Sequence, residues 1–439
     1  MNSKLFFWSI TVALGGLLFG SDTAVISGAE QAIQKFWQLD SWTHGLAVAI
    51  ALYGTVVGAL FASVPTDGIG RKKTLMWIGI LFFVSAIGAA VAQDIYVFMA
   101  FRFVGGVAIG ASSVTAPVYI SEIAPANKRG FLVALFQFNI VFGILLAYIS
   151  NYLLADVGQD AWRWMLGVVA IPSLLFTAMM IFVPESPRWL LMKKNDDEGA
   201  RAILRITDPD DTEGVLQSIK KGIAAQTSQT TVTEFFGGKY RRPIILAFLF
   251  AVFNQLSGIN AVIYFAPRIF EMTGSGKSVA LLSTAGIGVV NLIATMLGLA
   301  LIDRFGRRSL MFVGSVGYII SLGLIANAFF TQSYGGVMIY IFMFIASHAI
   351  GQGAVIWVFI SEIFPTQMRG YGQSLGSFTH WIFAAVITNV FPPLAESLGG
   401  GKIFIFFCFM MVLQLIYVWF LMPETKGVSL EELEKRMVK

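Results

Sequence analysis

Two ionisable residues stand inside long apolar stretches of this chain, where an unpaired charge is costly. Asp22 lies in a run that begins near Phe6, and Arg102 lies in one that begins near Tyr96. A charged side chain at the centre of a bilayer costs about 3 kcal/mol, so such residues pair with each other or face water. The pattern predicts an ion pair between Asp22 and Arg102. It is either a static link between two helices or a switch, in which Asp22 binds a proton when the pairing weakens.

Amide side chains form a second group of polar residues within the apolar stretches. An amide both donates and accepts hydrogen bonds, and in hydrocarbon it must bridge two helices or face a polar cavity. Together with aromatic faces, such amides suit a ligand that has many hydroxyls and one apolar face. Taken singly, each amide is equally accounted for by a hydrogen bond between helices. The amides are Gln137, Asn254, Gln255, Asn260 and Asn291.

The elements that hold these residues must be membrane-spanning helices. The chain has 439 residues, of which 56% are hydrophobic and 13% are charged, whereas soluble domains carry about 25% charged residues. Continuous apolar runs of roughly 20 residues, long enough to cross a bilayer core of about 30 Å, predict an all-α membrane protein with twelve transmembrane helices. The runs begin near Phe6, Gly45, Thr74, Tyr96, Gly130, Trp162, Pro243, Ser278, Leu310, Gly336, Gly372 and Ile403.

The chain also repeats itself, with the same motifs at the ends of equivalent helices. Asp67-x-x-Gly70-Arg71-Lys72 returns as Asp303-x-x-Gly306-Arg307-Arg308, and Ser121-Glu122-Ile123 with Arg129 returns as Ser361-Glu362-Ile363 with Arg369. Two parallel six-helix halves around a central site are the architecture of the major facilitator fold. We therefore expect one half at residues 1–190, a small cytoplasmic helical linker at 191–242, and a second half with a short tail at 243–439.

The charges and the single cysteine exclude several other classes of protein. Lysines and arginines gather in alternate connections between the helices, which places both termini in the cytoplasm by the positive-inside rule. The formal charge of +5 is therefore no sign of nucleic-acid binding. Cys408, the only cysteine, cannot form a disulfide or a thiol–metal site within one chain. No nucleophile–base arrangement, metal cluster or phosphate loop is apparent, so we expect neither an enzyme nor a metal site.

Taken together, these motifs resemble the sugar porter family of the major facilitator superfamily over essentially the whole chain. The resemblance rests on the two Gly-Arg-Lys/Arg loops, on Pro184-Glu185-Ser186-Pro187-Arg188, on Gln255-x-x-Gly258-x-Asn260 and on the ending from Pro423 to Gly427. It is nearest to the bacterial proton-coupled pentose and hexose symporters. Short loops and the resemblance suggest a bacterial cytoplasmic (inner) membrane.

The resemblance implies which residues contact the sugar. It places Gln137, Gln255, Asn260 and Asn291 at sugar-contacting positions, with Phe19, Trp357 and Trp381 as aromatic lining. Asn254 and His380 belong to the same site but stand where relatives usually carry other amides, so they bear on the choice of substrate. From their position in the apolar runs, His348 and His380 are either polar lining residues or sites that bind a proton.

The resemblance also implies how uptake is driven, since proton symporters of the family carry aspartate at the position of Asp22. We expect proton-coupled uptake of a monosaccharide by alternating access, with Asp22 and Arg102 as the coupling pair. The proton is the coupling ion, no other cofactor is needed, and the protein works in the lipid bilayer as a monomer. The alternatives are a facilitative uniporter, a myo-inositol–proton symporter and, from another class, a sugar receptor that does not transport.

The repeated acidic and basic residues predict a cytoplasmic gate. We expect an ion-pair network that closes the inner side and breaks in every cycle. Exposed ion pairs are individually weak, which suits a latch that must open, although basic residues would stand at these ends for topological reasons alone. The gate residues are Arg71, Glu122, Arg129, Glu185, Arg307, Glu362 and Arg369.

Overall fold

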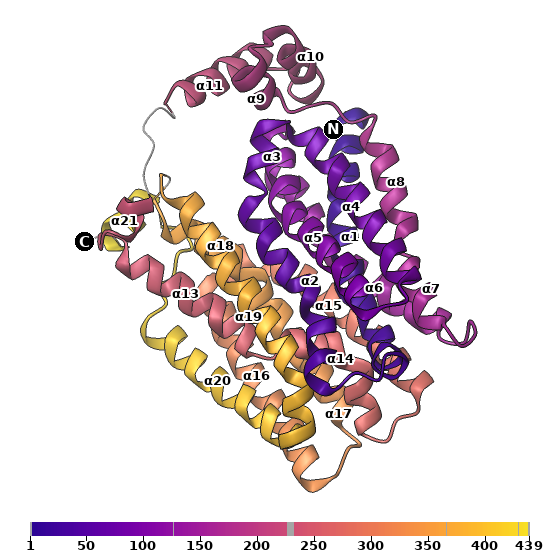
Figure 1. Cartoon of the computed structure of the whole chain (residues 1–439). Helices are drawn as coiled ribbons and strands as arrows, with labels where there is room; N and C mark the ends of the chain where they lie inside the picture. The colour runs from indigo at the N-terminus through magenta and orange to yellow at the C-terminus, as the bar shows by residue number, and fades with distance from the viewer. Residues whose placement is uncertain (1, 126, 226–231, 366, 429, 438–439) are drawn as a thin grey trace. The chain divides into compact units, whose positions relative to one another are not determined.

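The computed structural model of the protein describes residues 2–125, 127–225, 232–365, 367–428 and 430–437. Within these residues every regular element is a helix, as Figure 1 shows, which confirms the predicted all-α fold. Twelve of the described helical segments are long and apolar enough to cross a membrane. Each begins within four residues of its predicted start. The protein is a multi-pass membrane protein.

Eight of the spans are single helices and four are interrupted. The single ones are α1 (Ser3–Phe36), α4 (Arg71–Val91), α5 (Ile95–Ile123), α6 (Arg129–Leu154), α15 (Lys277–Phe305), α16 (Arg307–Thr331), α19 (Arg369–Leu398) and α20 (Gly400–Phe420). The interrupted ones are α2 (Ser41–Phe61) with α3 (Ser63–Gly68), α7 (Ala161–Gly167) with α8 (Ala170–Met180), α13 (Arg241–Leu256) with α14 (Ile259–Met272), and α17 (Val337–His348) with the π-helix η2 (Ala349–Gly353) and α18 (Ala354–Ile363).

The break between α13 and α14 has a clear cause at Gly258. This residue has φ +84°, and a Cβ there would lie 2.5 Å from the ring of Phe407. Only glycine combines that left-handed backbone with so close an approach. The break places several amides where two half-helices meet, which is where transporters of this architecture bind their substrates.

Short helices connect α8 to α13. They are α9 (Pro187–Trp189), the π-helix η1 (Leu190–Lys194), α10 (Asp197–Thr207), α11 (Thr212–Ala225) and α12 (Val232–Phe236), and α21 (Leu430–Met437) follows α20 near the end of the chain. The buried side chains of Leu191, Ala200, Leu204 and Leu216 hold η1, α10 and α11 together. Residues 226–231 of the predicted linker lie outside the described residues.

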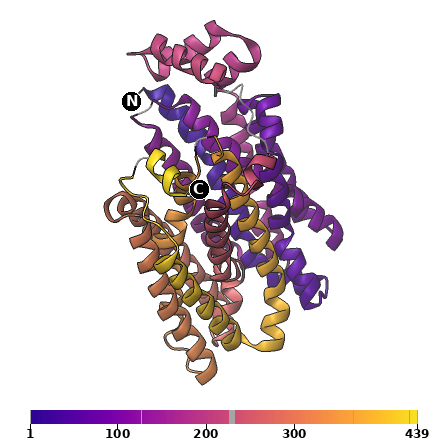
Figure 2. The same cartoon turned by 90° about the vertical axis from the view of Figure 1, so that its left-hand side faces the viewer.

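By its internal packing the chain divides into two compact units. One contains Met1–Thr23, Gly54–Ile144 and Leu166–Gln229, and the other contains Ala24–Tyr53, Leu145–Met165 and Thr230–Lys439. The helices α1, α2, α6 and α7 therefore pass from one unit into the other. Within the second unit α16 packs along α20 and α13 along α19 (Figure 1 and Figure 2). The division into halves at 190 and 243 stays a prediction.

Candidate functional site

Asp22 of α1 and Arg102 of α5 lie together as a buried ion pair. Nη1 of Arg102 lies 2.7 Å from Oδ1 of Asp22, and Nη2 donates to the backbone oxygen of Asp22 at 3.1 Å. The other carboxylate oxygen, Oδ2, is buried and has no hydrogen-bond partner among the described residues. Gly105 packs close by, since a Cβ there would lie 2.4 Å from Oγ of Ser85 and 3.5 Å from Oδ2. Buried polar atoms are almost always satisfied, so this oxygen is an open acceptor.

Gln255 is the centre of a polar cluster at the break between α13 and α14. Its Nε2 donates to Oδ1 of Asn254 at 2.9 Å, and its Oε1 accepts from Nδ2 of Asn260 at 2.7 Å. The same Nε2 lies 3.2 Å from the ring nitrogens of His380. The three amides are buried, and they satisfy one another in a chain that a ligand hydroxyl could join or replace.

Aromatic rings flank this cluster through His380 of α19. The His380 ring lies 5.2 Å from the ring of Trp357 in α18 and 4.7 Å from the ring of Trp381, centroid to centroid. Gln373 donates from Nε2 to the backbone oxygen of Trp357 at 3.0 Å, which fixes α18 against α19. Amides and aromatic faces thus lie side by side within one unit, an arrangement that suits a ligand with hydroxyls and an apolar face.

The three further predicted contact residues are divided between the two units. Asn291 of α15 is buried in the same unit as the cluster, and its Oδ1 accepts from Thr295 at 3.4 Å. Phe19 of α1, which is buried, and Gln137 of α6, which is half-buried, belong to the other unit. Their part in binding stays a prediction.

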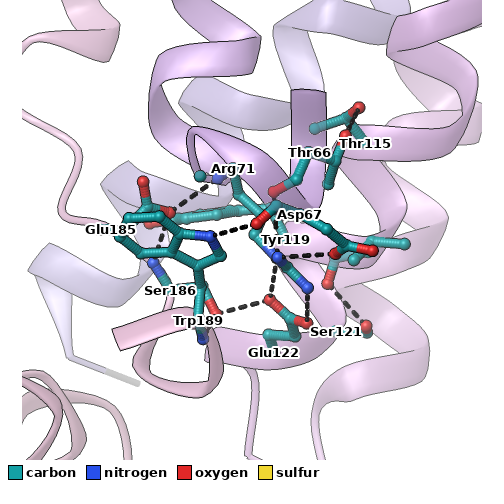
Figure 3. Close-up of polar contacts among 12 residues, drawn as sticks. Thr66, Asp67, Arg71, Thr115, Tyr119, Ser121, Glu122, Glu185, Ser186 and Trp189 are labelled. Atoms are coloured by element: carbon teal, nitrogen blue, oxygen red, sulfur yellow. Dashed lines mark hydrogen bonds and ion pairs between the residues drawn. The ribbon is translucent and has the colours of Figure 1, made fainter. Parts of the chain in front are cut away.

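A polar network surrounds the start of α4 (Figure 3). Arg71 donates from Nε to Oε2 of Glu122 at 2.9 Å and from Nη2 to Oε1 at 3.0 Å, and its Nη1 lies 3.0 Å from Oδ1 of Asp67. Ser186 also donates to Glu122. The fork of the guanidinium matches the two carboxylate oxygens, which is a stronger arrangement than a single contact.

Glu185 takes a different part in this network from the one predicted. Its Oε1 accepts from the backbone N–H groups of Arg71 at 2.9 Å and Lys72 at 3.1 Å, so it closes the first turn of α4. Gly70, at φ +101°, lets the chain turn there. A carboxylate at a helix N-terminus is stabilised by the unpaired N–H groups. Burial nevertheless raises the pKa of Glu185 above its ordinary value, and hydrogen bonds from backbone N–H groups oppose that shift.

The same network recurs at the start of α16. Arg307 donates from Nη2 to Oε1 of Glu362 at 2.7 Å and from Nε to Oε2 at 3.1 Å. Glu424 accepts from the backbone N–H of Arg307 and of Arg308, both at 3.0 Å, as Glu185 does in the first copy. Thr425 stands in place of Ser186 and donates to Glu362 at 2.6 Å.

Two predicted gate residues stand outside these networks. Among the described residues, neither Arg129 nor Arg369 forms an ion pair, and Nε and Nη2 of Arg369 are buried without a hydrogen-bond partner. Each network also lies within a single unit, and the role of both as a gate stays a prediction.

Two features were missed at the sequence level. Glu424 is the counterpart of Glu185, and the echo between Pro184–Arg188 and Pro423–Lys426 was the signal for it. Glu30, His44 and Arg268 form a second buried charged cluster. Its signal was an acidic residue that remains in the first apolar run eight residues after Asp22.

A twelve-helix fold whose two parts repeat one ion-pair motif, and whose broken spans carry amides into the bilayer, is that of a membrane transporter. The chain belongs to the family described as "Sugar (and other) transporter", which matches residues 8–437.

The proteins similar to this chain are named as transporters, and the similarity covers nearly their whole length. The glucose transporter GlcP of Staphylococcus epidermidis is 36% identical, with 99% of this chain and 97% of that protein covered. The D-xylose-proton symporter of Escherichia coli is 33% identical, with 99% and 96% covered. The inward open structure of the xylose transporter XylE from E. coli has a TM-score of 0.87 at 33% identity, with 99% of this chain and 100% of that chain covered. This likeness confirms the predicted major facilitator fold.

Proposed function

We propose that the protein takes up a monosaccharide, a pentose or a hexose, together with a proton across the cytoplasmic membrane by alternating access. The observation that carries the proposal is the buried Asp22–Arg102 pair with its open oxygen Oδ2. Relatives named as transporters of glucose, of D-xylose with a proton and of arabinose with a proton support it. The protein works as a monomer, and no cofactor besides the coupling proton takes part.

The coupling step follows from the charge of Asp22. While Arg102 is in contact, the carboxylate stays ionised. When the pair separates, a carboxylate in a water-poor site binds a proton more readily, and Oδ2 is its atom that has no hydrogen-bond partner in the described part of the chain. One charge that crosses the membrane gains about 2.3 kcal/mol per 100 mV. At about 1.4 kcal/mol per tenfold, this concentrates a neutral sugar roughly fifty-fold.

The sugar binds at the Gln255 cluster. Its hydroxyls take the places that Asn254, Gln255 and Asn260 now fill for one another, and its apolar face lies on Trp357 or Trp381. His380 contacts both the amides and the indoles. It is therefore the residue that distinguishes one sugar from another.

Both termini lie in the cytoplasm in this proposal, because the basic starts of α4 and α16 then lie on the inner side. The Arg71–Glu122 and Arg307–Glu362 networks are the parts of the inner latch that each unit supplies. They hold the inner side closed when the protein opens outward.

The test is radiolabelled uptake into energised vesicles with xylose, glucose, galactose, arabinose and myo-inositol, each with and without a protonophore. The wild type is compared with Asp22→Asn. Asp40→Asn is the control, because Asp40 accepts from the backbone of Trp42 and Thr43 at the start of α2, and asparagine caps a helix as well as aspartate does.

Symport predicts accumulation that the protonophore abolishes, loss of accumulation in Asp22→Asn with counterflow retained, and wild-type behaviour in Asp40→Asn. Uptake that only equilibrates, and that neither the protonophore nor Asp22→Asn changes, would show a uniporter. Accumulation of myo-inositol alone would show a cyclitol transporter.

A further inference from the structure

A second buried group of charges lies where α1, α2 and α14 meet. Oε2 of Glu30 lies 2.7 Å from Nε2 of His44. Arg268 donates from Nε to Oε1 of Glu30 at 3.0 Å and from Nη2 to Oε2 at 2.7 Å. The Glu30 and His44 side chains are both 0% exposed, whereas that of Arg268 is 25% exposed. A fully buried carboxylate is thus held by a cation that stands at the rim.

Among the residues that the structure describes, no other counter-ion forms an ion pair with Glu30. Gln34 accepts from Nη2 of Arg268 at 2.6 Å, and the ring of Phe265 lies 6.1 Å from that of His44. A hollow of about 490 Å³ adjoins Arg268, and the charged groups that line it are Lys35 and Glu271, with Gln31, Gln34 and Met272 between them. The side-chain amide of Asn151 of α6 approaches Gly28 of α1, and the backbone oxygen of Asn389 of α19 approaches Gly45 of α2, so both approaching groups are neutral.

The two ring nitrogens of His44 differ in their hydrogen-bond partners. Its Nε2 lies 2.7 Å from Oε2 of Glu30 and 3.4 Å from Nη2 of Arg268, while its Nδ1 is buried and has no hydrogen-bond partner among the described residues. A neutral imidazole that donates from Nε2 keeps a lone pair on Nδ1 and can bind a proton there. The cluster therefore holds two groups that can each bind a proton, Glu30 and His44. It also holds one cation, Arg268, which balances the charge of the carboxylate while no proton is bound.

The three helices that meet here come from both predicted halves of the chain, α1 and α2 from the first and α14 from the second. In alternating access, the end of the protein at which the halves meet must open once in each cycle. Under the orientation proposed above, this end is the outer one.

We propose that Glu30 and His44 form a second proton-binding site, at the outer end of the protein, where a proton from the outer solution replaces the guanidinium of Arg268 when that end opens. The proposal rests on the proposed transport function and its orientation. The exchange is balanced, because one cation leaves the carboxylate and one proton arrives. Without either, a carboxylate in a water-poor site would remain charged and unpaired, which is costly.

The direction of the pH effect follows from this exchange. The closed form holds Glu30 ionised against Arg268, whereas the open form holds one proton more. Acid on the outer side therefore favours opening, and alkali favours the closed form. Since opening takes up one proton, its equilibrium constant changes by at most about tenfold per pH unit.

The test measures opening directly, without sugar and without a proton gradient. Cys408 is the only cysteine, so Cys408→Ser provides a clean background. Val48 is buried and stands one turn from His44 on the same face of α2, and Val48→Cys reports opening to a membrane-impermeant methanethiosulfonate added outside. Labelling of Val157→Cys, an exposed position in the connection after α6, corrects for the effect of pH on the thiol itself.

The corrected labelling rate of the parent is expected to rise as the outer pH falls from 8 to 5.5, by up to about tenfold per unit. Glu30→Gln imitates the protonated carboxyl, so its rate is expected to be high and independent of pH. The proposal is wrong if Glu30→Gln keeps the parent's pH dependence, or if the parent's rate does not change with pH.

A second variant covers the case in which Glu30→Gln does not fold. Arg268→Gln leaves Glu30 in place and removes its cation, so labelling is expected to rise at neutral pH and its acid dependence to move to higher pH. A rate like that of the parent would overturn the proposal.

Asp22→Asn separates this inference from the proposed symport. The variant is expected to keep the parent's pH dependence of labelling, and a loss of that dependence would assign the titration to Asp22 instead. If uptake fails the symport test but labelling still depends on Glu30, the second proton site is supported and the proposed symport is not.

Discussion

Arg307 holds Glu362 through two parallel hydrogen bonds, from Nη2 to Oε1 at 2.7 Å and from Nε to Oε2 at 3.1 Å. Arg71 holds Glu122 in the same way in the first copy of the motif. A hydroxyl also donates a hydrogen bond to the glutamate of each pair, from Thr425 to Glu362 and from Ser186 to Glu122. The repeat in the sequence is therefore a repeat of one bonding pattern, and each unit of the structure contains one copy.

The first prediction concerns the forked shape of Arg307. Lysine carries the same charge but cannot make both bonds. If the pair stabilises the state that accepts outside sugar, Arg307→Lys lowers the population of that state, and the apparent KM for outside sugar rises by the same factor. A loss of about 1.4 kcal/mol corresponds to tenfold.

The measurement is the concentration dependence of initial uptake. Arg308→Lys is the matched control, because the Arg308 guanidinium contacts the backbone oxygens of Val418 and Trp419 and, within the described residues, no carboxylate. Equal KM values for Arg307→Lys and the wild type would contradict a latch role for this pair.

The second prediction concerns Gly306, which has φ +92° and ψ +165°, a backbone that essentially only glycine adopts. A Cβ there would lie 2.6 Å from Oε2 of Glu424. Gly399 starts α20 at φ +78° and ψ +159°, and a Cβ there meets nothing within 4 Å. Both Gly306→Ala and Gly399→Ala incur backbone strain of about 1–3 kcal/mol.

Gly306→Ala must also displace Glu424 from the N–H groups of α16, which adds about 1–3 kcal/mol for unsatisfied partners. Thermal unfolding in detergent is expected to show a lower Tm for Gly306→Ala than for Gly399→Ala. The same Tm for both would mean that Glu424 does not stabilise the start of α16.

The third prediction concerns Gln255, which bonds Asn254, Asn260 and His380. Gln255→Leu removes the amide and leaves its partners unsatisfied, at a cost of about 1–3 kcal/mol. The KM for sugar exchange is expected to rise by about tenfold to a hundredfold, while protonophore sensitivity remains. Asn327→Leu, at an exposed position on α16, is the control. An unchanged KM in Gln255→Leu would place the sugar elsewhere.

The fourth prediction concerns pH and Glu185. Burial raises the pKa of this carboxyl from its ordinary 4.5, so the stability that it contributes is complete below pH 4.5 and is lost as the pH rises through the raised value. As the pH rises from 4.5 to 7.5, the Tm of the wild type is therefore expected to fall relative to the Tm of Glu185→Gln. Glu396→Gln, at an exposed position on α19, is the control, and a difference that does not vary with pH would contradict the effect of burial.

Much of the fold could be predicted because it depends on local composition. Each of the twelve spans is a continuous apolar run, and the bilayer requires such a run to be a helix. The Asp22–Arg102 contact was predictable for a related reason, since two lone charges in hydrocarbon have few partners to choose from.

Other parts of the site depended on contacts that no local pattern reveals. Glu185 was expected to pair with a side chain, but it accepts from the backbone N–H groups that a helix leaves unpaired at its start. Arg129 and Arg369 share their motif with Glu122 and Glu362, yet they form no ion pair in the described part of the chain.

The sequence by itself determined the membrane class, the helices, the repeat and the residue types of the sites, because each follows from composition and spacing along the chain. Only the tertiary structure decided that Oδ2 of Asp22 has no hydrogen-bond partner among the described residues, and that Glu30 meets His44 and Arg268. Residues 30 and 268 are 238 positions apart. Whether they meet depends on how each helix is rotated and shifted against its neighbours, which packing sets and sequence spacing does not.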